Sequence, residues 1–270
     1  MSIADTQTID IHLSNILVRL PSSFNHLSIE QFYEKYGKPE TVPITRQDGK
    51  ELPANVPPMA VIPLYLGMHA KDFKLQDSSI LLSDFGESYS LFSGMHRNGE
   101  DCHTPLPMRP PEARFEPHTP LSYSADIWNL AVTIWEILGM KALFSNEYIT
   151  EDEMVSEHID VLGPMPTCWY ARWEARGEFF DQDGRPTERE VWPELEQAFE
   201  KGVQSYRRQR EMGEFGVEET RAILNLMRQM LTFQPEGRPT IEEVLNSKWM
   251  REWVIPEFQR ARAASTSHSE

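Results

Sequence analysis

Two short apolar runs, far apart in the chain, constrain its fold more than any other feature. Residues 15–18 read Asn-Ile-Leu-Val, and residues 79–84 read Ser-Ile-Leu-Leu-Ser-Asp. Short apolar runs of this kind are typical of strands. Each has a polar residue at one end, Asn15 before the first and Asp84 after the second. We therefore predict two strands that bracket a polar site, with a long insertion, residues 21–78, between them.

The insertion begins with a helical pattern and continues with prolines. Ser28 and Gln31 have the spacing of a capping box, Gly37 ends the pattern, and one face between them carries Phe32, Tyr33 and Tyr36, which predicts a short helix. The rest of the insertion, to about residue 75, predicts extended loop because it contains six prolines: Pro39, Pro43, Pro53, Pro57, Pro58 and Pro63.

Helical patterns dominate the chain after Ser124. A core helix is predicted by an apolar stripe at Ile127, Leu130, Ala131, Ile134 and Leu138. Later helices are predicted by a stripe at Ile223, Met227, Met230 and Leu231, and by a capping box at residues 240–243. Short helices are predicted for residues 163–215, and a disordered tail is predicted for the polar end, residues 256–270. The predicted fold class is mainly α, with a small β-hairpin at the site.

Composition restricts the class of partner and the compartment. The chain has 26 basic and 42 acidic residues, a net charge of −16, which argues against a general nucleic-acid-binding surface. A basic partner fits better, although a plain acidic surface explains the same charge. Two cysteines, Cys102 and Cys168, suggest a reducing compartment and no zinc site. We find no signal peptide or membrane span and expect the cytoplasm or nucleus.

Asp10, Asn15 and Asp84 form a candidate site for phosphoryl transfer. This chemistry needs an aligned hydroxyl, a group near its proton and cations on the phosphates. Asp10 and Asn15 are five residues apart, which suits a loop that presents a carboxylate to the substrate and an amide oxygen to a metal. Asp84 supplies a second hard oxygen, and Mg²⁺ is bound by a few such oxygens together with phosphate and water.

The order of the motifs resembles a protein kinase from its catalytic loop onward. The motifs are Asp-Ile-His-Leu-Ser-Asn at 10–15, Asp-Phe-Gly at 84–86, Arg-Pro-Pro-Glu at 109–112, Asp-Ile-Trp at 126–128, and Arg238. Residues 103–112 and 162–166 are similar to the CMGC group, particularly the fungal type of SR-protein kinase. The resemblance covers nearly the whole chain. It implies a helical carboxy-terminal kinase lobe over residues 1–255, with a CMGC-type insert at 163–215.

The resemblance also assigns roles at the site. Asp10 is then the catalytic aspartate, Asn15 and Asp84 hold Mg²⁺, and Phe85 and Gly86 complete the ATP site. The implied reaction transfers the γ-phosphate of ATP to serine or threonine of a protein substrate, possibly one rich in arginine and serine. The oligomeric state is left open.

Four further positions are structural in kinases. The Glu112 position pairs with the Arg238 position and fixes the activation segment, to which Arg109 also belongs, onto the helical core. The Asp126 position binds backbone of the catalytic loop. If Glu112 and Arg238 form such a buried pair here, removal of one partner costs about 3–5 kcal/mol.

The chain departs from the kinase pattern around the catalytic loop. Thr8 and Ile9 replace the usual His-Arg before Asp10, and His12 replaces the usual lysine. His12 is either a phosphate contact or a plain loop histidine. None of the 14 glycines is spaced as Gly-x-Gly, so no phosphate loop is found, and the amino-terminal β lobe is expected to be missing from this sequence.

Two functions therefore stay open. The chain is either a serine/threonine kinase whose amino-terminal lobe is missing here, and which is nearly inactive alone, or a pseudokinase that binds basic peptides without catalysis. A basic peptide could dock on an acidic cluster, although a solvated helix start is the simpler interpretation. The cluster comprises Glu151, Asp152, Glu153, Glu157 and Asp160.

Overall fold

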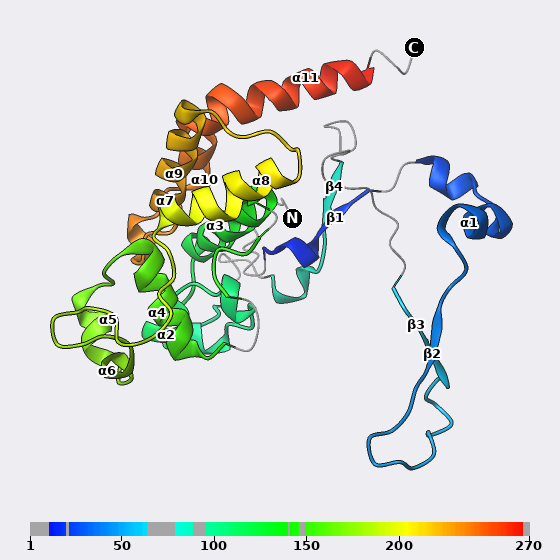
Figure 1. The fold of residues 1–270 in the computed structure, drawn as a ribbon, viewed down its shortest axis with the longest axis horizontal. Coiled ribbons are helices and arrows are strands. Elements are labelled where there is room, and N and C mark those ends of the chain that lie inside the picture. Colours follow the sequence, from blue (N-terminus) through cyan, green and yellow to red (C-terminus); the bar gives the residue numbers. More distant parts are fainter. Residues whose placement is uncertain are drawn as a thin grey trace. The chain divides into compact units, whose positions relative to one another are not determined.

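The computed structural model describes residues 11–19, 22–63, 79–88, 96–139, 141–145 and 149–266 (Figure 1). The chain divides into two compact units. The larger unit contains the residues up to Val18 and from Ser79 onward, and the smaller unit is Arg19–Ser78. The smaller unit thus corresponds closely to the predicted insertion. Among the described residues, no helix is long and apolar enough to cross a membrane.

The larger unit is mainly helical, as predicted. Strands β1 (Ile16–Val18) and β4 (Ile80–Leu82) pair in antiparallel orientation. The helices are α2 (Glu112–Phe115), α3 (Tyr123–Gly139), α4 (Glu151–Leu162), α5 (Thr167–Arg172), α6 (Arg176–Phe179), α7 (Leu195–Ala198), α8 (Ser205–Gln209), α9 (Val217–Met230), α10 (Ile241–Leu245) and α11 (Ile255–Thr266). A π-helix, Phe199–Gln204, joins α7 to α8, and another, Met250–Val254, leads into α11.

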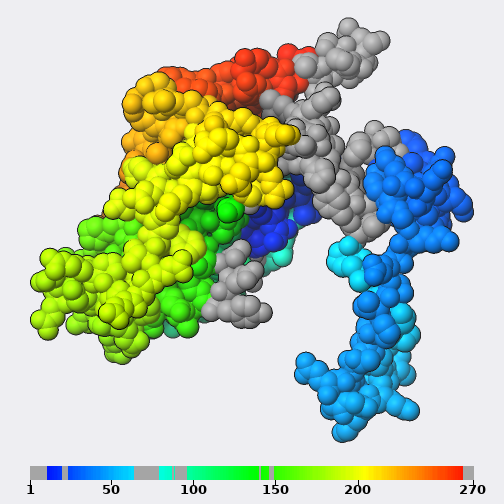
Figure 2. Space-filling model, viewed as in Figure 1, coloured from blue at the N-terminus to red at the C-terminus, as the bar shows by residue number. Residues whose placement is uncertain are grey.

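Helix α3 lies at the centre of the core. Trp128 and Ala131 are fully buried, and Val132 and Trp135 are each 1% exposed. The predicted stripe is only partly right, because Leu130 is among its half-buried members. The reason is that α3 contacts both α9 and the π-helix Phe199–Gln204, so neighbours bury more than one face of it. On the face seen in Figure 2, residues near 200 (yellow) lie over α3 (green).

The short helices predicted within residues 163–215 are present as α5 to α8. The predicted disordered tail is wrong for most of its length, because α11 continues to Thr266. Residues 259–264 read Gln-Arg-Ala-Arg-Ala-Ala, which are strong helix formers. An ion pair between Glu257 and Arg260, three residues apart, adds local support.

The smaller unit contains the predicted helix and an unpredicted hairpin. Helix α1 (Ile29–Tyr36) begins with the capping box of Ser28 and Gln31. Strands β2 (Thr41–Pro43) and β3 (Met59–Val61) pair in antiparallel orientation, so the prediction of extended loop is wrong there. Pro43 is compatible with the ladder because the bonded positions are Ile44 with Pro58 and Ile62 with Glu40, and the backbone nitrogen at 43 faces away from β3.

Candidate active site

The pairing of β1 with β4 brings the two ends of the predicted site together. Ile16 lies opposite Leu82, and Val18 lies opposite Ile80. One residue beyond this ladder, the carbonyl oxygen of Asn15 accepts hydrogen bonds from the backbone nitrogen of Ser83 (2.8 Å) and from its hydroxyl (3.1 Å). The two strands that the apolar runs predicted are thus present, and their pairing brings Asn15 beside the residue that precedes Asp84.

Asn15 is held in place by His12. Its backbone nitrogen donates to the carbonyl oxygen of His12 (2.9 Å), its Nδ2 lies 3.2 Å from His12 Nε2, and its side chain is buried. The direction of this side-chain contact depends on the imidazole tautomer. Together, the two contacts tie the Asn15 amide, whose oxygen is of the kind that binds a metal, to His12.

Asp84 has an unusual backbone. Its φ of 56° and ψ of 64° place it in the left-handed region, which aspartate tolerates better than most residues but which still costs roughly 1–3 kcal/mol. Gly86 lies close to its carboxylate, since a β-carbon at position 86 would lie 3.3 Å from Asp84 Oδ1. A side chain there would crowd this oxygen. Phe85, between them, is half exposed.

The segment before Asn15 is tied to the core. The hydroxyl of Thr133, on α3, donates to the carbonyl oxygen of Ile11 (3.0 Å). This bond fixes the chain one residue after Asp10, and Asp10 itself lies outside the described residues. Asp126, in the first turn of α3, was assigned a contact with the catalytic-loop backbone, and that contact stays a prediction.

Glu112 and Arg238 form the expected buried pair. The two Nη atoms of Arg238 contact the two carboxylate oxygens at 2.7 and 2.6 Å. The remaining guanidinium hydrogens reach the carbonyl oxygens of Ser124, Thr232 and Phe233, and the group lies over the ring of Trp128 at 5.0 Å. All five donors of the guanidinium are therefore used, which is the condition under which a buried ion pair is tolerated.

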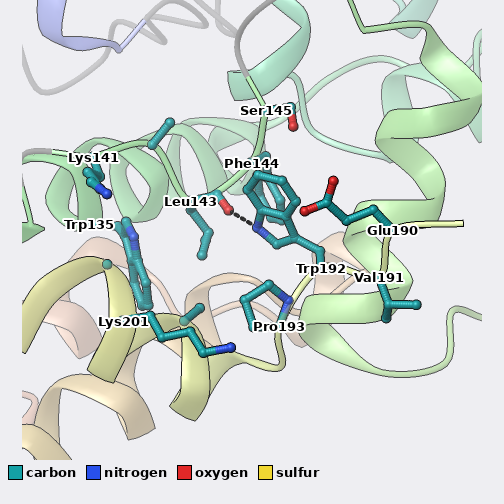
Figure 3. A pocket seen from close by; sticks show the side chains of 13 residues that line it. Trp135, Lys141, Leu143, Phe144, Ser145, Glu190, Val191, Trp192, Pro193 and Lys201 are labelled. Carbon is teal, nitrogen blue, oxygen red and sulfur yellow. Dashed lines mark hydrogen bonds between the residues drawn. The ribbon is translucent and has the colours of Figure 1, made fainter. Parts of the chain in front are cut away.

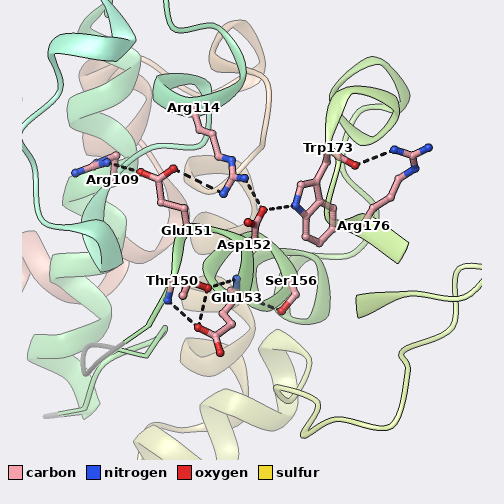
Figure 4. Close-up of polar contacts among 9 residues, drawn as sticks. All are labelled: Arg109, Arg114, Thr150, Glu151, Asp152, Glu153, Ser156, Trp173 and Arg176. Carbon is pink, nitrogen blue, oxygen red and sulfur yellow. Dashed lines mark hydrogen bonds and ion pairs between the residues drawn. The ribbon is translucent and has the colours of Figure 1, made fainter. Parts of the chain in front are cut away.

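The acidic cluster on α4 is occupied by partners within the chain (Figure 4). Arg109 and Arg114 contact Glu151, and Arg114 and the indole nitrogen of Trp173 contact Asp152. Glu153 closes a capping box with Thr150. Arg109 also donates to the carbonyl oxygen of Thr104 (3.1 Å). The acids at the start of α4 thus fasten the segment around residue 109 to the helix.

The last two acids of the cluster are also engaged. Glu157 accepts from the backbone nitrogen and hydroxyl of Ser145, and burial raises the pKa of its carboxyl, an effect that these bonds partly offset. Asp160 forms a two-bond pair with Arg189 and accepts from the backbone nitrogen of Trp192. Arg114 and Arg189 could not be predicted as partners of these acids, because they lie 38 and 29 residues away in the sequence.

The donor atoms at the hairpin fit magnesium in type. An amide oxygen and a carboxylate are the hard ligands that Mg²⁺ prefers, and this ion needs few protein ligands. In the part of the chain that the structure describes, no group of three or more His, Cys, Asp or Glu side chains could hold a metal ion. That result does not bear on a site made from one amide and one carboxylate.

Comparison with protein families gives one match. The family model described as Protein kinase domain matches residues 72–250. The matched range contains Asp84, Glu112, Asp126 and Arg238, and it begins after His12 and Asn15. A comparison with curated proteins finds no match.

Proposed function

This chain belongs to the protein kinase domain family, and from that membership we propose that it is a serine/threonine kinase of the SR-protein-kinase-like type within the CMGC group. Kinase domains in general use ATP, a divalent metal and protein substrates. The observation that supports the proposal is the β1–β4 pairing, in which the carbonyl oxygen of Asn15 accepts from Ser83, the residue before Asp84. Asn15 and Ser83 are 68 positions apart in the sequence, so the fold alone brings their chain segments together.

Each residue of the site has a proposed task. Asn15 and Asp84 hold Mg²⁺, and His12 orients the Asn15 amide through the 3.2 Å contact. Asp10, one residue before the carbonyl that Thr133 fixes, orients the substrate hydroxyl and takes its proton. Phe85 and Gly86 complete the nucleotide site, where Gly86 leaves room beside Asp84 Oδ1. When bound, ATP supplies the phosphoryl group that is transferred.

We propose that the 270-residue polypeptide is a slow catalyst. Its sequence contains no Gly-x-Gly, so it lacks the phosphate loop by which kinases position the triphosphate. Positioning contributes about 7–11 kcal/mol to catalysis, and a loss of even 4 kcal/mol slows the reaction roughly a thousandfold. Phosphorylation of an Arg/Ser peptide should therefore be near background, and rapid phosphorylation that disappears in Asp10→Asn would contradict this.

A basic protein substrate remains the proposed class. The net charge of −16 supports it, but the acidic cluster on α4 does not, because its carboxylates have partners within the chain. We also propose the cytoplasm or nucleus as the location. Both cysteines are free thiols, which is compatible with a reducing compartment.

A second candidate is an interaction module without catalysis. It is favoured by apolar side chains that the hairpin exposes: Leu17 at 47%, Val18 at 50% and Ile80 at 58%. Exposed apolar groups of this kind are often binding surfaces. On this alternative, the site at Asn15 and Asp84 binds no nucleotide.

Nucleotide-dependent thermal stability separates the two candidates. Millimolar Mg²⁺ and ATP should raise the melting temperature of the purified chain, because a ligand that binds only the folded state stabilises it. The shift should vanish in Asp84→Asn and persist in Asp183→Asn, which changes an exposed aspartate elsewhere. No shift in the unmodified chain, or an equal shift in Asp84→Asn, would reject the kinase site and leave the interaction module.

A further inference from the structure

A cavity on the side of the helical unit plays no part in the site described above. Its volume is about 740 Å³, within the ordinary range of ligand pockets, and it is lined by residues from the end of α3, the loop after it, the segment before α7 and the π-helix Phe199–Gln204. None of these elements contributes to the β1–β4 hairpin. The cavity therefore needs its own explanation.

Close packing of two glycines shapes one wall of the cavity. A β-carbon at Gly139, the last residue of α3, would lie 2.9 Å from the carbonyl oxygen of Gly202, so α3 and the π-helix approach each other more closely than larger residues allow. Lys141 follows the first glycine by two positions, and Lys201 directly precedes the second. This contact thus brings two lysines, 60 residues apart in the sequence, to the lining of one cavity.

The opposite wall is also fixed. The indole nitrogen of Trp192 donates to the carbonyl oxygen of Leu143 at 2.7 Å. The backbone nitrogen of Trp192 donates to Asp160, which is itself paired with Arg189. Behind these groups, Trp135, Leu143 and Phe144 are each no more than 1% exposed. The cavity therefore has an apolar floor and walls that are held by hydrogen bonds.

The charges around the cavity are distributed unevenly. Figure 3 shows Lys141 and Lys201 on the Trp135 side, whereas the carboxylate of Glu190 lies on the far side of Trp192. In the described part of the chain neither lysine forms an ion pair with a carboxylate, and the ammonium of Lys141 lies 5.4 Å from the ring centre of Tyr206. Two lysines and one glutamate give the lining a local charge of 2 − 1 = +1, in a chain whose net charge is −16.

We propose that this cavity binds an acidic and apolar peptide segment of a partner protein. Carboxylates of the segment contact Lys141 and Lys201, and a bulky apolar side chain packs against the half-buried Trp192 and Pro193 of the lining. Glu190 repels an anion at the other end and so sets the direction in which the segment lies. Charge complementarity argues for this occupant, because a basic segment would meet two unpaired ammonium groups.

A binding measurement with labelled peptides tests the proposal. The probe is a fluorescein-labelled peptide of alternating glutamate and leucine, and its comparison peptides carry glutamine or lysine in place of glutamate. Fluorescence anisotropy with the full chain should show binding of the glutamate peptide only. Its affinity should fall as salt is raised, because exposed charges are screened. The assay contains no ATP, so its outcome is independent of the proposed catalytic function.

Three variants test which charged side chains bind the glutamate peptide. The double variant Lys141→Glu with Lys201→Glu should weaken binding by at least about tenfold, and Glu190→Gln should strengthen it by about twofold to fivefold. Lys38→Glu reverses an exposed lysine in the other unit and should leave the affinity unchanged. Equal binding by the double variant, equal binding of the glutamine peptide, or preferred binding of the lysine peptide would overturn the proposal.

Discussion

At the scale of single residues, the most informative contact is the one between Glu112 and Arg238. The sequence indicated both residues only through their resemblance to kinase positions, because nothing in local patterning can pair residues 126 apart. The structure adds what resemblance did not supply. The guanidinium also binds three carbonyl oxygens and lies over Trp128, so Arg238 joins the start of α2, the start of α3 and the segment before α10.

Replacing Arg238 should be strongly destabilising. Arg238→Ala leaves the Glu112 carboxylate buried without its partner, and the free energy of unfolding should fall by about 3–5 kcal/mol. Arg208→Ala is the matched control, because Arg208 pairs with Glu200 and Glu214 on the surface and its loss should cost less than about 1 kcal/mol. Chemical denaturation measures both, and equal effects would contradict the buried pair.

His158 makes the fold sensitive to acid. It is fully buried among Trp128, Phe144 and Phe233, and burial lowers its pKa from 6.5 to about 3, with a smaller contribution from Arg238. The folded state therefore keeps His158 neutral, whereas the unfolded chain takes up a proton below pH 6.5. The contribution of neutral His158 to the free energy of unfolding is therefore complete above pH 6.5, and it is lost as the pH falls toward 3.

The loss can be isolated with a substitution. Between pH 8 and pH 5 this one residue should remove roughly 2 kcal/mol from the free energy of unfolding. His158→Leu should reduce the drop by that amount, whereas His118→Leu, which changes a histidine that is 82% exposed, should not alter it. An unchanged drop in His158→Leu would show that His158 does not cause the acid sensitivity.

At the scale of elements, the sequence predicted those whose signals are local. The predicted capping boxes at Ser28 and Thr240 both begin helices, because such a box is complete within four residues. The hairpin β2–β3 and helix α11 were missed. The hairpin was missed because its strands pair across 15 residues and the prolines around it indicated a loop. Helix α11 was missed because small polar residues in the tail obscured a run of good helix formers.

The candidate active site shows the same difference between local signals, which the sequence reveals, and long-range contacts, which it does not. The strands at Asn15 and Asp84 were predicted from their apolar runs, and the register that joins them could not be, because the insertion separates them in the sequence. The acidic cluster was identified as a group, but its partners were not, since Arg114, Arg189 and Ser145 reach it only through the fold.

The contact of α3 with the π-helix should be intolerant of larger residues. Gly139→Ala places a β-carbon 2.9 Å from the backbone oxygen of Gly202, and it should destabilise the fold by about 1–3 kcal/mol. Gly177→Ala in α6 is the control, because nothing lies within 4 Å of its added carbon and alanine favours a helix. Melting temperatures should move down for the first variant and not for the second.

At the scale of the whole molecule, the chain consists of a helical unit interrupted by a smaller one. The helical unit stops at Val18 and resumes at Ser79, and Val18 is paired with the next residue, Ile80, in the β1–β4 ladder. The ends of the insertion are thus as close as the ends of a tight hairpin. A short turn could therefore connect β1 directly to β4, so the helical unit does not need the insertion to join these strands.

Removal of the insertion tests this independence. Replacing residues 18–80 with Asn-Gly lets the hydrogen-bonded pair Leu17–Leu81 close a two-residue hairpin turn, and it should leave the helical unit folded with a melting temperature close to that of the full chain. Circular dichroism would follow both proteins. A cooperative transition that is lost or lowered by more than about 10 °C would show that the units stabilise each other.

The proposed catalytic function requires that Asn15 and Asp84 form one metal site. Mn²⁺, a paramagnetic substitute for Mg²⁺, should be added to the labelled protein while its backbone amide signals are recorded by NMR. The signals of Asn15 and of residues 83–86 should broaden first, and Asp84→Asn should abolish this selectivity. Broadening that begins at the acidic cluster on α4, while the signals of Asn15 and residues 83–86 stay unchanged, would contradict a metal site at the hairpin.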